Sequence, residues 1–340
     1  MKVTLQQIAD AAGVSRGTVD RALHDRGRID PAVAKHIISI ANELGYVSQK
    51  KPKAVISDRI RIGFVTFLSE RAFSAEINKG IEKAKEELAQ WGIEILIEKC
   101  ASISEIEQAE AIDRLTEKGI NGLAIMPVDS ALIRSRLNYI SEELHIPTVT
   151  FNTDIIGTKR SHFVGMDNKK SGKVAAGLMG MLTQGTGSVL IITGSFANNA
   201  YSLRVESFIE ELKASYPSIK IAGVQCAFDN MDELDSILEN SLLHGSGISG
   251  VLITSAGQDG VEAAFKKLNL HARPYVILYD LTPCTKNALT TGIADFVIEQ
   301  DCFSQGYNAA YTLANMLVKN QIPSDEFLYT DIGIKTKYNI

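Results

Sequence analysis

Six polar residues of this 340-residue chain follow short apolar runs that are typical of buried strands. They are Asn152, Asp154, Arg204, Ser255, Asp280 and Gln300. Carboxylate, amide, hydroxyl and guanidinium groups together supply acceptors and donors, and a buried hydroxyl left unpaired costs about 1–3 kcal/mol. Phe73, at the exit of the first run, adds an aromatic surface for the C–H face of a sugar. The set predicts a site for a small polyhydroxylated ligand.

Patterns for catalysis, metal binding and cofactors are missing from the sequence. There is no phosphate loop, no GxGxxG turn and no nucleophile elbow. The four cysteines have no CxxC spacing and the six histidines do not cluster, so we expect no disulfide framework, metal site or cofactor. A sugar-metabolising enzyme stays an alternative, because an aspartate at a strand end can act as a base.

A second group of informative residues lies near the N-terminus, in the segment SRGTVDRAL that starts at Ser15. Arg16 and Arg21 project from one short predicted helix and are not needed for its core. The arginine fork suits bidentate contact with guanine in the major groove. Ser15, Thr18 and Thr4 lie at helix starts, where hydroxyls and backbone amides favour phosphate oxygens. These residues predict contact with double-stranded DNA.

Three short helices are expected to position these side chains. The first should run from about Leu5 to Ala12, because Thr4 begins a capping box. Gly13 then permits a sharp turn, and Ser15 caps a second helix. The segment IDPAVAKHIISIANELGY predicts a third helix, with an aspartate cap and a proline in its first turn. The three make a helix-turn-helix unit; the alternative is a small helical subdomain with solvated arginines.

The charge distribution separates this unit from the rest of the chain. Residues 1–59 hold ten Lys and Arg against six Asp and Glu, whereas the remaining residues hold 25 against 34. A small basic head on an acidic body is expected where only the head meets a polyanion. Between them, the segment VSQKKPKAVISDRI carries three lysines and a proline and predicts a linker.

The body alternates nine short apolar runs with segments of helical periodicity, from IRIGFVTF to DFVIEQ. This alternation predicts buried parallel sheets, and its restart after HFVGMDNKKSGKVAAG predicts two similar α/β lobes with a ligand between the strand ends. The N-terminus has no apolar core of signal-peptide length, and no apolar run reaches the roughly 18 residues of a membrane span. We therefore expect a cytoplasmic protein without a membrane partner.

The segment TLQQIADAAGVSRGTVDRAL, followed by ANELGY, resembles the headpiece of the lactose-repressor (LacI-type) family of bacterial transcription regulators. The resemblance implies that Arg16, Gly17 and Arg21 read bases and that His24 is a further DNA contact. It also implies that the linker folds into a hinge helix on DNA and wedges Val55 into the minor groove. A flexible basic tether whose lysines meet phosphates is the alternative.

The remainder of the chain resembles the periplasmic sugar-binding-protein fold that this family uses as its sensor. FVGMDNKKSG and DFVIEQDCFSQGY are similar to its ribose and simple-sugar subclass. The resemblance implies that Phe73 is the aromatic platform and that Asn152 takes the place of a hydroxyl-binding aspartate. It implies further that the forked guanidinium group of Arg204 binds the sugar and that Asp280 and Gln300 contact the sugar from the second side of the cleft. In TSAGQDG the Asn-Asp pair of the family is absent.

Together these patterns predict an N-terminal all-α helix-turn-helix headpiece joined to a two-lobed, type I periplasmic-binding-protein-like α/β domain. The expected bounds are 1–47 for the headpiece, 48–60 for the hinge or linker and 61–340 for the two-lobed domain. Lobe 1 is expected at about 61–163 and 292–323, and lobe 2 at about 164–291 and 324–340.

The expected function is a ligand-controlled transcription regulator, in particular a repressor. It would bind a pseudo-palindromic operator as a homodimer and respond to a small sugar or sugar-like effector. A sugar-binding protein of transport type shares the body but needs export, and it is the second alternative beside the enzyme.

Overall fold

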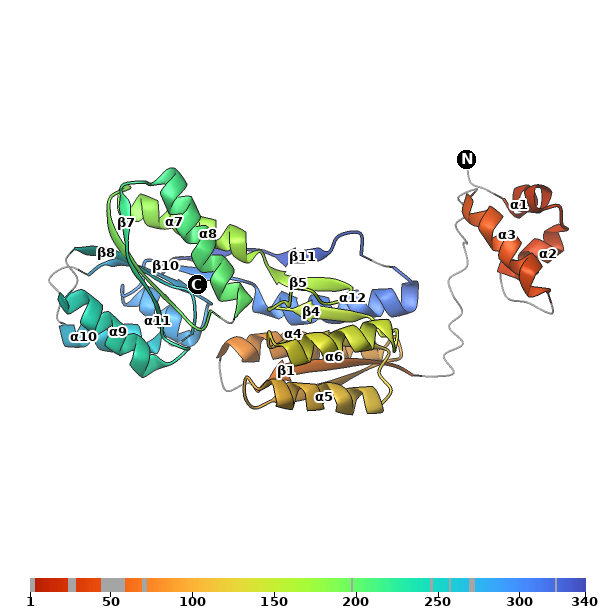
Figure 1. Cartoon of the computed structure of the whole chain (residues 1–340), viewed down its shortest axis with the longest axis horizontal. Helices are drawn as coiled ribbons and strands as arrows, with labels where there is room; N and C mark the ends of the chain where they lie inside the picture. Colours follow the sequence, from red (N-terminus) through yellow and green to blue (C-terminus); the bar gives the residue numbers. More distant parts are fainter. Residues whose placement is uncertain are drawn as a thin grey trace. The chain divides into compact units, whose positions relative to one another are not determined.

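The structure is a computed structural model, and it describes residues 4–23, 29–43, 59–68, 72–196, 198–244, 247–256, 258–268, 273–321 and 323–340. The chain divides into two compact units, Met1–Ser57 and Asp58–Ile340, which we call the head and the body (Figure 1). The head contains three helices: α1 (Leu5–Ala12), α2 (Arg16–Leu23) and α3 (Pro31–Glu43).

The helices of the head begin where the sequence predicts, and α1 also ends there. The backbone amide of Thr4 donates to Oε1 of Gln7 at 2.9 Å, and the Thr4 hydroxyl accepts from the Gln7 amide, which completes the capping box. Gly13 adopts the left-handed conformation at φ 63° and ends α1. The head core consists of buried residues from all three helices: Ile8, Ala9, Val19, Ile37 and Ala41.

Two six-stranded sheets form the body, each in its own lobe (Figure 1). The first sheet has the order β11-β5-β4-β3-β1-β2 and the second the order β12-β10-β9-β8-β6-β7. Neighbouring strands are parallel, except that β12 runs antiparallel to β10. This confirms the predicted α/β class with parallel sheets in two lobes.

The strands of the first sheet are β1 (Ile60–Phe67), β2 (Ile93–Cys100), β3 (Gly122–Ile125), β4 (Thr148–Phe151), β5 (His162–Met166) and β11 (Phe327–Thr330). Those of the second are β6 (Gly187–Thr193), β7 (Ile219–Cys226), β8 (Ile248–Ile253), β9 (Tyr275–Tyr279), β10 (Phe296–Glu299) and β12 (Gly333–Lys335). The helices of the body are α4 (Ala72–Ala89), α5 (Glu105–Glu117), α6 (Ala131–Glu142), α7 (Asn168–Leu182), α8 (Asn199–Ser215), α9 (Met231–His244), α10 (Asp259–Leu268), α11 (Pro283–Thr290) and α12 (Cys302–Lys319).

Helices cover both faces of each sheet, so the central strands are buried on both sides. In the first lobe α4 and α12 pack with the sheet into one apolar cluster, and α5 and α6 into another. Burial on both faces explains the nearly continuous Val, Ile and Leu runs of these strands. Asp167, which the sequence places at a helix start, caps α7 by accepting from the Lys170 amide at 2.9 Å.

The chain crosses between the lobes three times: after β5, after β10 and between β11 and β12. The crossings lie further along the chain than the expected lobe boundaries. Phe296–Glu299 joins the second sheet although we expected 292–323 in lobe 1, and Phe327–Thr330 joins the first sheet although we expected 324–340 in lobe 2. The apolar runs of both lobes look alike, so their composition does not say which sheet a strand joins.

Helices α4 and α12 cross at glycines, and this contact yields a prediction. A Cβ on Gly80 would lie 2.1 Å from the backbone oxygen of Phe303, so an alanine side chain has no room there. Gly80→Ala should therefore lower the free energy of unfolding by about 2 kcal/mol, the usual cost of overpacking a tight contact. Urea unfolding of the purified chain measures this.

Gly177, in the interior of α7, is the matched control, because a Cβ there meets no atom within 4 Å. Gly177→Ala should raise the free energy of unfolding by up to about 1 kcal/mol, since alanine is the better helix former. Equal effects of the two substitutions would contradict a close crossing at Gly80.

A carboxylate on the same pair of helices predicts a pH dependence of stability. Glu87 accepts hydrogen bonds from the hydroxyls of Tyr307 and Tyr311, each at 2.7 Å, and lies 3.2 Å from the Lys83 ammonium. The two tyrosine hydroxyls and the lysine lower the pKa of Glu87 to about 2. This folded-state pKa lies below the ordinary value. The contribution of ionised Glu87 to the free energy of unfolding is therefore complete above the ordinary pKa and is lost as the pH falls towards 2.

The double variant Tyr307→Phe and Tyr311→Phe should be less stable than the wild type at pH 7. The difference should shrink as the pH is lowered from 5 to 3, as measured by urea unfolding at each pH. A difference that stays constant over this interval would mean that the tyrosines act by packing alone.

Candidate functional site

Three residues that follow strands of the two sheets, Asn152, Asp280 and Gln300, meet between the lobes. Asn152 follows β4 of the first lobe, and its Nδ2 donates to Oε1 of Gln300 at 3.2 Å. Gln300 follows β10 of the second lobe, and its Nε2 donates to Oδ1 of Asp280 at 2.6 Å. Asn152 and Asp280 both have left-handed backbones, at φ 63° and 67°. Asn and Asp tolerate this conformation, which turns the chain at the strand end.

Gln305, which the sequence did not single out, fixes the orientation of these amides. Its Oε1 accepts from Asn152 Nδ2 at 2.9 Å, and its Nε2 donates to the backbone oxygen of Gln300 at 2.8 Å. Gln305 lies in the first turn of α12 and is fully buried. Because Asn152 and Gln300 are held in this way, their remaining polar atoms have defined directions.

Arg204 projects from α8 and is only 3% exposed. Its Nε donates to Oδ1 of Asn168 at 2.8 Å and its Nη1 to the backbone oxygen of Thr254 at 2.9 Å. The guanidinium carbon lies 4.5 Å from the centre of the Tyr279 ring, a cation–π contact. No described residue accepts from Nη2 of Arg204, which leaves one end of the fork for a ligand.

Asp280 is electrostatically coupled to this arginine. Burial raises the pKa of Asp280 above its ordinary value, while the Arg204 charge and the Gln300 hydrogen bond act in the opposite direction. Its Oδ2 accepts from no described residue. We call Asn152, Arg204, Asp280, Gln300 and Gln305 the polar cluster. It presents fixed donors and acceptors from both lobes, an arrangement suited to a ligand with several hydroxyls.

The structure places the other three residues of the predicted ligand set differently. Ser255 follows β8, is buried, and donates only to the neighbouring Ala256 carbonyl at 3.4 Å. Phe73 lies in the first turn of α4 and packs against the core of the first lobe. Asp154 binds Arg160 through both carboxylate oxygens, each at 2.6 Å, so its hydrogen bonds do not reach the polar cluster.

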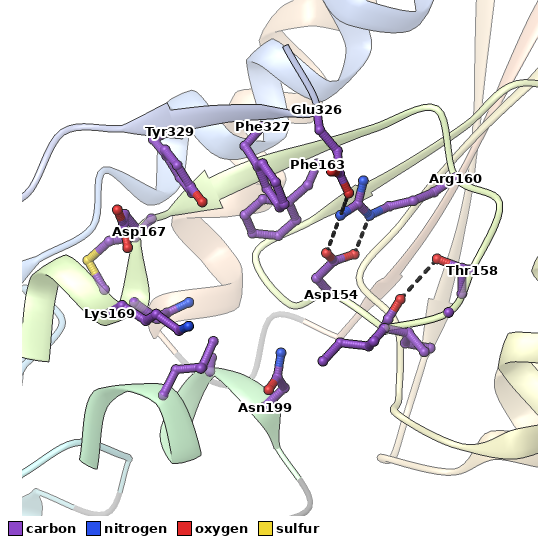
Figure 2. A pocket seen from close by; sticks show the side chains of 17 residues that line it. Asp154, Thr158, Arg160, Phe163, Asp167, Lys169, Asn199, Glu326, Phe327 and Tyr329 are labelled. Carbon is purple, nitrogen blue, oxygen red and sulfur yellow. Dashed lines mark hydrogen bonds and ion pairs between the residues drawn. The ribbon is translucent and has the colours of Figure 1, made fainter. Parts of the chain in front are cut away.

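Asp154 instead lines a separate pocket of about 380 Å³ between the lobes, which we call the interlobe pocket (Figure 2). Its walls come from the loop after β4, from β5 and β11 of the first lobe, and from the first turns of α7 and α8 of the second. Among the seven residues of the predicted ligand set, Asp154 alone lines it. Asn168 lines it as well and is the residue that binds Arg204 of the polar cluster.

In the head, the predicted DNA-contacting residues lie on α2 and at its start. Arg16 is exposed, and no described residue pairs with it. Arg21 is exposed and donates from Nε to the Gly17 carbonyl of its own helix at 3.1 Å. The Ser15 hydroxyl accepts from the Thr18 amide at 3.1 Å and caps α2.

Gly17 is exposed between these residues, and Thr4 is exposed at the start of α1. His24, Val55 and most of the linker lie outside the described residues. Among the described residues, no group of His, Cys, Asp and Glu could hold a metal ion, and no helix is long and apolar enough to cross a membrane.

Comparison with known families identifies both units. The profile of the lacI family of bacterial regulatory proteins matches residues 4–49, and that of the periplasmic binding protein domain matches residues 62–321. The body belongs to the periplasmic binding protein domain family, and the head carries a lacI-family region. This confirms the resemblance on which the assignment of Arg16, Gly17 and Arg21 depends.

Relatives of this chain are named regulators. The HTH-type transcriptional regulator DegA of Bacillus subtilis is 25% identical over 217 residues, which cover 63% of this chain and 61% of that protein. The HTH-type transcriptional repressor CytR of Escherichia coli is 30% identical over 159 residues, or 43% of this chain and 45% of that protein. The matches thus span less than two thirds of these relatives.

Solved structures show the fold of the body. GanP, a glucose-galactose binding protein from Geobacillus stearothermophilus, superposes with a TM-score of 0.75 at 22% identity, over 83% of this chain and 99% of that one. A solute binding protein from Bacillus halodurans with bound myo-inositol superposes with a TM-score of 0.73 at 19% identity, over 83% of this chain and 96% of that one.

Sequence reasoning missed a further group of hydrogen-bonded polar residues in the body. The Tyr201 hydroxyl donates to Oδ1 of Asp229 at 3.0 Å, and the Ala256 amide donates to the same oxygen at 3.0 Å. Asp229 and the preceding Phe228 both have left-handed backbones, at φ 58° and 51°, and Phe228 is 67% exposed. A bulky residue in that conformation marks a strained turn at the end of β7, and such turns concentrate at functional sites.

Proposed function

We propose that this chain is a transcriptional regulator that binds operator DNA through its head and is controlled by a small sugar or sugar-like effector at the polar cluster. The observation that carries the proposal is Arg16, exposed and without a partner among the described residues in the first turn of α2. In a helix-turn-helix unit, the N-terminal residues of the second helix contact base edges. The same chain carries a periplasmic binding protein fold.

The head supplies both kinds of DNA contact. Arg16 and Arg21 are exposed on α2 as candidate base readers. Thr4 and Ser15 cap their helices and lie where the free amides of a first turn favour phosphate oxygens. We propose that His24 and Val55, the latter in a hinge helix, extend this interface. A transport-type protein or an enzyme has no role for such a unit.

The polar cluster supports a neutral, hydroxyl-rich effector. The groups of the cluster that have no partner among the described residues are Nη2 of Arg204, Oδ2 of Asp280 and the side-chain oxygen of Asn152, and together they include a donor and acceptors. Phe73, Asp154 and Ser255 complete the proposed set. The structural neighbours are named for glucose, galactose or myo-inositol binding, so these sugars and inositols are the first compounds to test.

The mechanism follows from the origin of the cluster in both lobes. An effector that contacts Asn152 in the first lobe and Asp280 in the second binds one interlobe angle better than another, and so shifts the equilibrium between them. We propose a homodimer with one head on each half-site, in the bacterial cytoplasm, where lobe rotation changes the placement of the heads. The proposed bounds are 1–47 for the headpiece, 48–60 for the linker and 61–340 for the two-lobed domain, although β1 already begins at Ile60.

Selection from a random DNA library tests the proposal directly. The purified chain is mixed with duplexes that carry a random segment of about two helical turns, and bound DNA is sequenced after several rounds. We expect enrichment of an inverted repeat, and a change in its affinity when the effector found by thermal shift is added. Recovery of unrelated sequences, with no repeat, would contradict specific operator binding.

A further inference from the structure

We propose that the interlobe pocket is a second ligand site, separate from the polar cluster, and that it takes a small aromatic carboxylate. The pocket, of about 380 Å³, lies within the range usual for sites of small molecules. Its size suits an acid with one or two rings. The proposal concerns a different ligand class from the effector and does not depend on DNA binding.

One wall of the pocket is aromatic. Phe327 and Tyr329 alternate along β11, so both rings lie on the same face of the strand. The rings are nearly parallel, at 9°, with centres 5.5 Å apart, and the residues are 38% and 49% exposed. Phe163 of β5 supports Phe327 edge-on, with ring centres 6.1 Å apart. Exposed, fixed aromatic rings favour stacking by a flat ligand ring.

The charges behind this wall are already paired. The Arg160 guanidinium carbon lies 5.1 Å from the centre of the Phe327 ring, and the side chain is only 6% exposed. Both oxygens of Asp154 bind it at 2.6 Å, and Glu326 binds it at 3.0 Å. This ion cluster holds Phe327 in place, and no other cation among the described residues lines the first-lobe side of the pocket.

The opposite wall combines apolar contacts with unpaired donors. Ala200 and Leu203, one turn apart on α8, line the pocket. Lys169 of α7 and Asn199 of α8 lie on this side, across from Phe163 and Phe327 (Figure 2). No described residue pairs with the ammonium of Lys169 or the side-chain amide of Asn199.

The nearby carboxylate of Asp167 is engaged by its own helix, since its Oδ1 accepts from the Lys170 amide at 2.9 Å. Among the described residues, the unpaired cation on the second-lobe side is Lys169 and the unpaired amide donor is Asn199, while Oδ2 of Asp167 remains an acceptor. A carboxylate satisfies both, through a charge-assisted hydrogen bond to Lys169 and a neutral one to Asn199. A ligand ring on the aromatic wall and a carboxylate at these donors span the pocket.

Such a ligand would touch both lobes and would favour one interlobe angle. Asn168 lines the pocket and also holds Arg204, so a shift at one site is transmitted to the other by direct contact. We therefore expect the acid and the effector to change each other's affinity by the same factor. This last expectation rests on the proposed function, whereas binding of the acid does not.

Isothermal titration calorimetry of the full chain tests the site with cinnamate as the probe. Cinnamamide, which lacks the charge, and cyclohexanecarboxylate, which lacks the aromatic ring, are the matched compounds. We expect cinnamate to bind and both controls to bind at least about fivefold more weakly, because each removes one of the two recognised features. Absence of cinnamate binding up to about 10 mM, or equal binding of all three, would overturn the proposal.

Two variants and a matched control locate the binding. Lys169→Met should lower the affinity for cinnamate about fivefold, and Tyr329→Ala should lower it about tenfold. Both side chains are exposed, so folding should be retained, as circular dichroism checks. Lys170→Met removes the same charge from the next residue, which does not line the pocket, and should change the affinity less than about twofold. Equal effects of the two lysine variants would place the acid elsewhere. Since no sugar or DNA is present, a failure here leaves the proposed function standing.

Discussion

Arg204→Ala should abolish the rise in melting temperature that the effector gives the wild-type chain. In the wild type, an effector at about a hundred times its Kd adds about 2.7 kcal/mol to the free energy of unfolding, a shift of roughly 5–8 °C for a body of this size. Losing a buried charged partner costs about 3 kcal/mol, or roughly a hundredfold in Kd. The shift should therefore fall to near zero at the same concentration.

The measurement is a thermal-shift screen against pentoses, hexoses and inositols, run on both proteins. Arg204→Ala also lowers stability without ligand, because it leaves Oδ1 of Asn168 and the Thr254 carbonyl without their donor. For this reason the compared quantity is the ligand-induced shift and not the melting temperature itself.

Asp280→Asn provides a gentler second variant, since it keeps the shape of the side chain and removes its charge. The Asp280→Asn variant should bind the effector more weakly while it preserves the fold. Lys213→Ala, an exposed change in the last turn of α8, is the matched control and should leave the shift intact. An unchanged shift in Arg204→Ala would place the effector outside the polar cluster.

Arg16→Ala should reduce affinity for the selected DNA by at least about tenfold while random DNA is bound almost as before. Each bidentate arginine–guanine pair is worth about 1–3 kcal/mol of discrimination, and a homodimer would lose one pair in each half-site. The side chain has no partner among the described residues, so the fold of the head should not change.

Fluorescence anisotropy with the selected duplex and with a shuffled duplex gives the specificity ratio. A loss of base reading lowers this ratio and leaves the salt dependence nearly intact, whereas a loss of phosphate contact weakens both duplexes and flattens the salt dependence. If Arg16→Ala lowered the affinity for both duplexes equally, Arg16 would contact the phosphate backbone and not the bases.

The head could be predicted nearly residue by residue because its signals are local. A capping box at Thr4, a left-handed glycine at Gly13 and a cap at Ser15 each act within one helical turn. Such short-range signals are read directly from the sequence. The bounds of α1, Leu5–Ala12, agree with the expectation.

The body could be predicted in class but not in every strand. The nine apolar runs are strands, but β5, β11 and β12 were not recognised. Phe327–Thr330 is an exposed edge strand, so it lacks the continuous apolar pattern of a strand buried on both faces. Its place beside β5 depends on a contact between residues far apart in the chain.

The polar cluster was predicted in part for a similar reason. Asn152, Asp280 and Gln300 could be found because each follows an apolar run, and the structure joins them by hydrogen bonds. Gln305 could not be found, since it lies in the first turn of a helix, where polar residues are common. The pairing of Asp154 with Arg160, six residues away, was equally invisible without the fold.

The three crossings between the lobes also determine what a protease or a gene truncation can remove. A single cut at any one crossing leaves the lobes joined by the other two crossing segments, so no single cleavage releases one lobe. A gene fragment that ends after β5 would encode the first sheet without β11 and without α12, the helix that packs on α4. The head, by contrast, is joined through one continuous segment, so one cleavage frees it. The body is therefore inherited as one piece, while the head can be exchanged for another by a single recombination.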